Sequence, residues 1–356
     1  MLRNKAILGL LMFLFILPGL AWGAPSESEN EAQDSQSATM FLPIAGNNAD
    51  DDLMVGGMLI HSTASSQTKM PLFFSDSAYD LGLDLEKYFN SGQNLLTVKA
   101  ASKDWPEEFF GVGRHNLLEK AEIYTIIESK LELSYLWKLS KGFYIGPAVN
   151  WQRLEVSGQE RGGWLDTAML YGENKTTVIG SGIHILWDTR DSDTFSSKGN
   201  FFEALAYGYD DALGSGCDFS QVNLDYRHFY EIAPRHALGL QGLMVWSDGD
   251  VPFQMQPTLG TDSLMRGLKE RYRDDNCLMF QGEYRFPISR RFSGTVFAGV
   301  GEVFSKENDL RFDELMYSGG IGLRFALIEK AKLNLRLDIA VGESDKQLFI
   351  GYGEAF

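Results

Sequence analysis

The stretch Gly260-Thr-Asp-Ser-Leu-Met-Arg-Gly-Leu-Lys-Glu270, continued by residues 271–276 and by Cys277-Leu-Met-Phe-Gln-Gly-Glu-Tyr-Arg-Phe-Pro287, contains the pattern that decides the fold. Its last part alternates strictly, with apolar residues and a glycine at even positions and Gln281, Glu283 and Arg285 between them. This period of two indicates a β-strand with one apolar side and one charged side. A soluble β-sandwich would bury the apolar side, whereas a transmembrane barrel turns it to lipid and the charged side to a wet lumen.

The same alternation recurs along the chain and favours the barrel. In residues 332–342, for example, Asn334, Arg336 and Asp338 share a face opposite a row of leucine, isoleucine and valine. A dry sandwich core could not accept these charged side chains cheaply. Most of the expected strands are also long enough to cross a bilayer at a tilt. The expected strands span 52–63, 76–89, 94–103, 121–137, 142–155, 175–188, 199–210, 218–232, 236–248, 276–288, 291–305, 316–328, 332–344 and 347–356.

The connections between these strands alternate in length. Every second one is short, as at 90–93 and 233–235, with 189–198 as the single longer exception. The others include long loops, among them 103–120 and 248–276. Outer-membrane barrels show this asymmetry, with short turns in the periplasm and long loops outside. The sequence therefore predicts an all-β, antiparallel transmembrane barrel of about 14 strands, within a range of 12 to 16.

The N-terminal part of the chain indicates export. Two basic residues, Arg3 and Lys5, precede an apolar run that ends in small residues, as in a secretory signal peptide. We expect a signal peptide at 1–23, an acidic disordered linker and lead-in at 24–51, and the barrel at 52–356. The expected location is the bacterial outer membrane, where membrane lipid and the machinery that inserts barrels are the expected partners.

Charge and composition exclude several function classes. The formal net charge of −16 argues against nucleic-acid binding, which requires a basic face. No Gly-x-Ser-x-Gly elbow is present. The one obvious candidate for the catalytic histidine of a lipase is His228, which lies between two tyrosines, and no serine is clearly paired with it, so we expect no enzyme. The histidines have no partner at i+2 or i+4, so we expect no metal and no cofactor. Asp274 and Asp275 suggest either a surface Ca²⁺ site or a solvated charged loop.

Three further groups of residues are candidates for defined structural roles. Asp188, Arg190 and Asp191 flank a turn and are expected to hold it together. Cys217 and Cys277 fall at the outer ends of strands two apart, where one disulfide is conceivable. The chain ends in an aromatic strand whose Gly351, Tyr352 and Phe356 resemble the signal that delivers outer-membrane proteins to the insertion machinery.

Three separated motifs resemble the BamA/TamA family of outer-membrane barrels, also called the bacterial surface antigen family. The first is Arg266-Gly267 in a long outer loop, followed by the strand Gly282-Glu-Tyr-Arg-Phe-Pro287. The second is Gly182-Ile-His-Ile-Leu-Trp-Asp-Thr-Arg-Asp191 followed by Gly199, and the third runs from Gly320 to Phe356. The resemblance implies a barrel-only member without the periplasmic POTRA modules, because only 28 residues separate Gly23 from Asp52.

The resemblance also implies that the Arg-Gly loop folds back into the lumen. Arg266 would then meet Glu283, because a guanidinium in a narrow lumen requires a bidentate carboxylate, and Gly267 would permit the tight turn. The chain departs from the family at Gly299, where the family has a second acid, and at Leu268, where an aromatic residue is usual. The implied function is to assist insertion or transport of polypeptide or lipid. A passive small-solute channel and a structural or docking barrel remain the alternatives.

Overall fold

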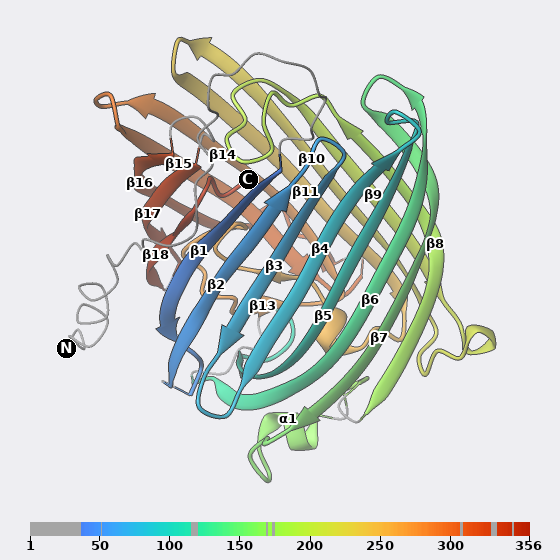
Figure 1. Ribbon diagram of the computed structural model, residues 1–356. Coiled ribbons are helices and arrows are strands. Elements are labelled where there is room, and N and C mark those ends of the chain that lie inside the picture. Colours follow the sequence, from blue (N-terminus) through green and yellow to red (C-terminus); the bar gives the residue numbers. More distant parts are fainter. Residues whose placement is uncertain are drawn as a thin grey trace.

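The computed structural model describes residues 37–356, except 51, 115–119, 169, 173–174, 307–308, 329–332 and 344. The expected signal peptide at 1–23 and most of the expected linker lie outside the described residues. Sixteen strands form one antiparallel sheet that curls into a barrel, and each strand pairs with the next one along its wall (Figure 1). Among the described residues, no helix has the length and apolar character to cross a bilayer.

The wall consists of strands that follow chain order, with two short lumenal strands inserted between β11 and β14. The strands of the first half are β1 (Ala38–Asn47), β2 (Leu53–Ser62), β3 (Ser66–Phe74), β4 (Tyr79–Phe89), β5 (Asn94–Phe109), β6 (Glu122–Ser140), β7 (Phe143–Ser157) and β8 (Thr176–Asp188). Those of the second half are β9 (Gly199–Tyr209), β10 (Phe219–Ala233), β11 (His236–Gly249), β14 (Asn276–Pro287), β15 (Phe292–Phe304), β16 (Met316–Ile328), β17 (Leu333–Gly342) and β18 (Lys346–Tyr352). The inserted strands are β12 (Thr258–Leu259) and β13 (Tyr272–Arg273).

The charged side of the wall faces inward and the apolar side faces outward, as the alternation predicts. On β14, Glu283 and Arg285 are 0% and 2% exposed, whereas Phe280 on the opposite face is 56% exposed. The same holds on β17, where Asp338 is 0% and Ile339 is 53% exposed. Burying charged groups while exposing aliphatic ones is favourable only where the surroundings are lipid. This sidedness confirms the transmembrane barrel.

The sequence misses two of the sixteen strands. β1 lies in the segment expected to be a lead-in, so the barrel begins before Asp52, and β3 lies in an expected long loop. Each contains a proline, Pro43 and Pro71, which cannot donate to a ladder and argues against a strand in the sequence. The β3–β4 register accordingly has no pair at Met70 or Pro71. The number of strands lies at the upper end of the expected range.

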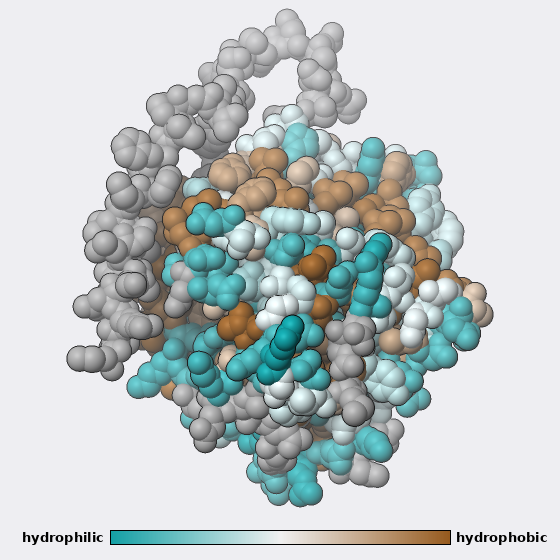
Figure 2. Space-filling view, turned by 90° about the horizontal axis from the view of Figure 1, so that it is seen from below, coloured by the Kyte–Doolittle hydropathy of each residue, from teal (hydrophilic) through white to brown (hydrophobic). Residues whose placement is uncertain are grey.

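Loops gather at one end of the barrel and also fill its lumen. Seen from that end, hydrophilic residues cover much of the surface and hydrophobic ones gather toward the rim (Figure 2). The segment between β11 and β14 folds inward, as expected, and its Leu259, Met265 and Leu268 pack on wall residues of β14 and β16. Closer to the loop end, Phe253 packs on Phe109 and on other aromatic and aliphatic residues. The loop end of the lumen therefore contains two packed apolar clusters.

The first and last strands of the sheet meet without a backbone ladder among the described residues. A hydrogen bond crosses this seam, from the Tyr352 hydroxyl to the Pro43 carbonyl at 2.8 Å. β18 ends at Tyr352, and Gly353, with φ of +75°, turns the chain away from the strand. The seam is therefore the weakest junction between neighbouring strands of the barrel wall.

Candidate functional site in the lumen

The inward loop carries its arginine at a sharply bent tip. Met265 and Gly267 have φ of +49° and +112°, so the backbone reverses on both sides of Arg266. A Cβ at Gly267 would lie 2.8 Å from the carbonyl carbon of Val341, so only glycine fits against β17 here. The side-chain oxygen of Gln347 accepts hydrogen bonds from the backbone N–H groups of Gly267, at 3.0 Å, and Lys269, at 3.1 Å. The tip is therefore fixed to β17 and β18.

Arg266 binds two carboxylates on two different strands. Its guanidinium donates to Glu283 on β14 at 2.6 Å and also to Asp338 on β17. The guanidinium carbon lies 3.5 Å from the centre of the Phe297 ring, which gives a cation–π contact. All three ionised groups are at most 1% exposed, so each depends on the others for neutralisation.

These residues belong to a larger set, here called the lumen charge network: Arg266, Arg285, Arg324, Glu283, Asp338 and Glu354. Arg285 donates to Glu283 at 2.8 Å, and Arg324 donates to Asp338 and, at 2.7 Å, to Glu354. The three cations balance the three anions. A Cβ at Gly322 would lie 2.1 Å from a carboxylate oxygen of Asp338, so this glycine leaves the space that the network occupies.

The second acid of the network is not where the family pattern places it. Gly299 contributes no carboxylate, and Asp338 from β17 supplies one instead. The alternation of β17 places Asp338 in the lumen, but it does not reveal that Arg266 reaches across from the loop to that strand. Leu268, which replaces the usual aromatic residue, is 1% exposed in the apolar core of the loop.

The chain end leaves the barrel wall before the end of the expected strand 347–356. Tyr352 lies at the end of β18 next to the seam, but Phe356 is 8% exposed and packs against Phe229, at 6.3 Å between ring centres. The main-chain oxygen of Phe356 accepts a hydrogen bond from Arg285 at 2.9 Å. The end marked C accordingly lies within the outline of the barrel (Figure 1). The expected strand 347–356 therefore ends at Tyr352 and not at Phe356, because the chain turns inward at Gly353.

The turn residues after β8 bond to their own segment. Asp188 accepts three side-chain hydrogen bonds from Arg190, the shortest of them at 2.7 Å. Asp191 accepts from the backbone N–H of Ser197 at 2.8 Å and from its hydroxyl at 2.7 Å. This turn reaches across the mouth of the lumen, since the carbonyl of Ser196 accepts from Arg285 at 2.9 Å. These contacts give the turn cluster a structural role.

The possible disulfide is not present, since Cys217 and Cys277 are both free thiols. Cys277 pairs with Val245, which pairs with Asn223 on β10. Cys217 lies six residues before Asn223, which is roughly 20 Å along a strand and far beyond disulfide reach. Burial raises the pKa of the Cys217 thiol above its usual value.

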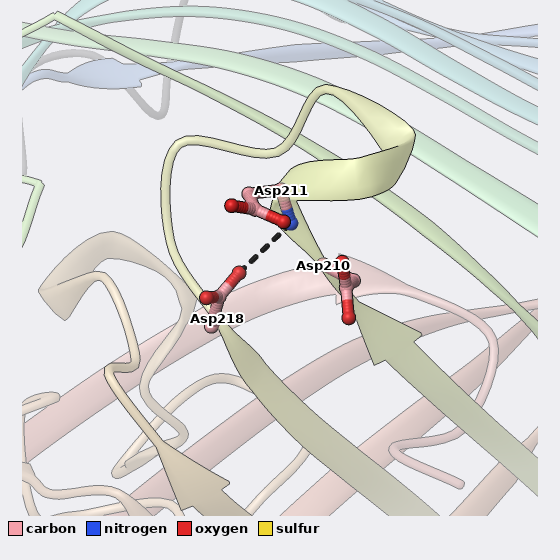
Figure 3. A group of neighbouring side chains, drawn as sticks. All are labelled: Asp210, Asp211 and Asp218. Carbon is pink, nitrogen blue, oxygen red and sulfur yellow. Dashed lines mark hydrogen bonds between the residues drawn. The ribbon is translucent and has the colours of Figure 1, made fainter.

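One group among the described residues has the spacing of a metal site, at the loop between β9 and β10. It consists of Asp210, Asp211 and Asp218, all exposed (Figure 3). Asp210 accepts from the backbone N–H of Ala212 at 2.8 Å, and Asp218 accepts from that of Asp211 at 2.9 Å. These bonds cap the 3₁₀ helix at Asp211–Leu213, which accounts for the cluster without an ion.

Asp274 and Asp275 do not join a metal-type group among the described residues. Burial raises the pKa of Asp274 to about 6, and it also raises the pKa of Asp275. Of the histidines, His115 lies outside the described residues. The others each contact a non-metal partner: His61 contacts Thr39, His184 contacts Glu203, His228 contacts Asn200 and His236 contacts Tyr284.

The sequence pattern of the Omp85 superfamily domain matches residues 46–356. No curated protein sequence matches the chain significantly. Similar solved structures include BamA from Haemophilus ducreyi lacking POTRA domains 1–3, with 10% identity over 90% of this chain and 70% of that one, at a TM-score of 0.60. CdiB from Escherichia coli is 12% identical over 91% of this chain and 63% of the CdiB chain, with a TM-score of 0.59. CdiB from Acinetobacter baumannii is 11% identical over 90% of this chain and 59% of the CdiB chain, with a TM-score of 0.56. The chain thus spans less than two thirds of either CdiB chain.

Proposed function

Because the chain belongs to the Omp85 superfamily, we propose that it acts in the bacterial outer membrane as a translocation or assembly barrel, closed at rest by its inward loop. The single observation that carries this proposal is the way in which Arg266 holds the loop. Its two carboxylate partners lie on β14 and β17, and Gln347 on β18 holds the backbone of the same tip, so the loop is fixed to the wall as far as the last strand before the seam. Releasing the loop would change the lumen and the seam together.

The seam supports the same proposal. β1 and β18 each present one edge with no strand ladder, and unpaired backbone groups are costly in lipid. An incoming strand of a polypeptide substrate would satisfy these groups. Tyr352 and Pro43 make a hydrogen bond across the seam, and no strand ladder joins its two edges among the described residues, so little has to break before the seam opens.

The packed loop end argues against a steadily open pore. Leu259, Leu268 and Phe253 are at most 1% exposed inside the barrel. A passive channel is supported by two polar cavities. One, of about 650 Å³, is lined by Lys99, Glu203 and other charged residues, and the other, of about 640 Å³, is lined by Lys103, Glu107 and residues of the inward loop. In planar bilayers we expect silence from the native chain and current steps from Arg266→Ala. Steady current from the native chain would instead support the channel.

The assembly role is tested by deletion and by fixing the seam. Deleting the protein should lower the amounts of other barrels in the outer membrane, and normal amounts would contradict the proposal. For the seam, we place cysteines at Pro43 and Tyr352 in a Cys217→Ser, Cys277→Ser background and join them with a bifunctional maleimide.

The matched control joins Ile339→Cys to Leu348→Cys, which pair directly within the existing β17–β18 ladder. The joined seam should fail to restore the other barrels, whereas the joined control should restore them. Equal restoration by both pairs would exclude seam opening.

A further inference from the structure

The outer wall of the barrel contains an apolar groove that the proposed function does not use. It has a volume of about 590 Å³ and crosses β10, β11, β14, β15 and β16. Small residues form its floor, namely Gly242, Gly282 and Ala298. Phe280 and Tyr317, which are 56% and 64% exposed, stand in one row across the wall, with Phe280 between Gly242 and Val300 and Tyr317 next to Val300. The groove opens outward, where the medium around the barrel is hydrocarbon.

Basic residues gather at the ends of the same strands. The turn between β10 and β11 carries Arg235, and the neighbouring turn between β14 and β15 carries Arg290 and Arg291, all exposed. Arg235 joins the two turns, since its guanidinium donates to the carbonyls of Ser289 at 2.8 Å and Arg290 at 3.2 Å. In a chain of net charge −16, the three arginines of these two touching turns outnumber the exposed acid beside them, Glu231, and give a local excess of positive charge.

The spacing between the turns and the groove matches one leaflet. Gly242 lies seven residues after Arg235 on β11, roughly 24 Å along the strand and about 18 Å along the membrane normal at the usual tilt. Half of a bilayer, with its headgroup region, is about 20 Å thick. Near the turns, His236 bonds the Tyr284 hydroxyl at 2.7 Å, as interfacial aromatic residues do. The turns therefore lie at headgroup level and the groove lies among the acyl chains.

We propose that the groove and the two turns bind a phospholipid of the periplasmic leaflet. The phosphate would lie against Arg290 and Arg291, and one acyl chain would follow the floor of Gly242, Gly282 and Ala298. A polypeptide strand is the less suitable occupant, because β11, β14 and β15 are each paired on both sides and offer it no free edge. A phospholipid matches this surface because its negatively charged phosphate requires basic side chains and its acyl chain requires an apolar groove.

The test is native mass spectrometry of the full chain in detergent, titrated with palmitoyl-oleoyl phosphatidylglycerol. Arg290→Ser with Arg291→Ser removes the charge, and Ala298→Leu fills the groove while pointing to lipid. The matched controls are Lys141→Ser, which removes a charge from another exposed turn of the same end, and Ala206→Leu, which enlarges an alanine on β9 outside the groove. Folding of every variant is checked by its heat-modifiable mobility on gels.

We expect the arginine double variant to bind the first lipid about 10- to 30-fold more weakly, from an effect of roughly fivefold or less for each of the two charges. Ala298→Leu should weaken binding several-fold, and both controls should bind as the native chain does. Phosphatidylcholine should bind the native chain more weakly than phosphatidylglycerol. Equal binding by all variants would overturn the proposal, as would a native chain that retains no lipid or a polypeptide that crosslinks to the groove in membranes.

Discussion

Separating Arg266 from Glu283 tests whether the lumen charge network holds the inward loop. Both groups are at most 1% exposed and lie 2.6 Å apart. Removing one partner of a buried ion pair typically costs about 3–5 kcal/mol. Arg266→Ala leaves both acids with other arginines, since Glu283 keeps Arg285 at 2.8 Å and Asp338 keeps Arg324. We therefore expect a loss near the lower limit, about 3 kcal/mol.

Glu283→Ala should cost a similar amount, because Arg266 then retains only Asp338. The double variant should lose clearly less than the sum of the two single losses, with a coupling free energy of about 1.5–3 kcal/mol. The assay is equilibrium unfolding in urea of chains refolded into lipid vesicles, followed by tryptophan fluorescence. All four chains of the cycle are measured in the same vesicles.

The matched control is a cycle on Arg311 and Glu314, whose charged atoms lie 3.9 Å apart in an exposed loop. An exposed pair of this kind should show a coupling within about 0.5 kcal/mol of zero. If the coupling of Arg266 and Glu283 is equally small, the two residues do not act as a pair and the proposed hold on the loop is refuted.

Three further outcomes follow from the geometry. Gly299→Asp, which restores the usual family acid, should lower stability in the same urea assay. Its Cβ would lie 3.1 Å from the Cβ of Gln281, and Asp338 already provides the second carboxylate that binds Arg266. A more stable variant would contradict this. The pKa of Asp274 is raised to about 6, so the folded chain binds the proton of this carboxyl group more tightly than the unfolded chain does. Protonation of Asp274 therefore stabilises the fold fully below about pH 4, and this stabilisation is lost as the pH rises through about 6. Hydrogen exchange around it should therefore be slower at pH 5 than at pH 7.5 after correction for intrinsic rates, and Asp274→Asn should remove the difference. Gel mobility should not change on reduction, and Cys277, which is 0% exposed, should react with maleimide only after unfolding.

Local alternation predicted the parts of the fold that depend on one strand at a time. It gave the inward faces of β14 and β17 correctly, because lipid on one side and lumen on the other require a period of two. It missed β1 and β3, where Pro43 and Pro71 interrupt the pattern. Pro43 is tolerated because β1 is an edge strand of the sheet, and Pro71 is tolerated because the β3–β4 ladder has a gap at that position.

The candidate site could be predicted only in part. The resemblance to a family placed Arg266 near Glu283, but the contact with Asp338 depends on how far the loop reaches across the lumen. The same limit applies to Cys217 and Cys277, whose separation follows from the register of β10, β11 and β14. The inward tail at Glu354 and Phe356 depends on Gly353, whose positive φ has no unique signature in the sequence.

The lumen charge network also sets an order of events during biogenesis. Arg266 and Arg324 precede two of their anions, Asp338 and Glu354, in the chain, so a nascent barrel that still lacks its final hairpin contains cations without their counterions. In such an intermediate Arg266 has Glu283 but not Asp338, so its hold on the loop is incomplete. Addition of β17 and of the segment after β18 completes the neutralisation, so full seating of the loop depends on these last parts of the barrel.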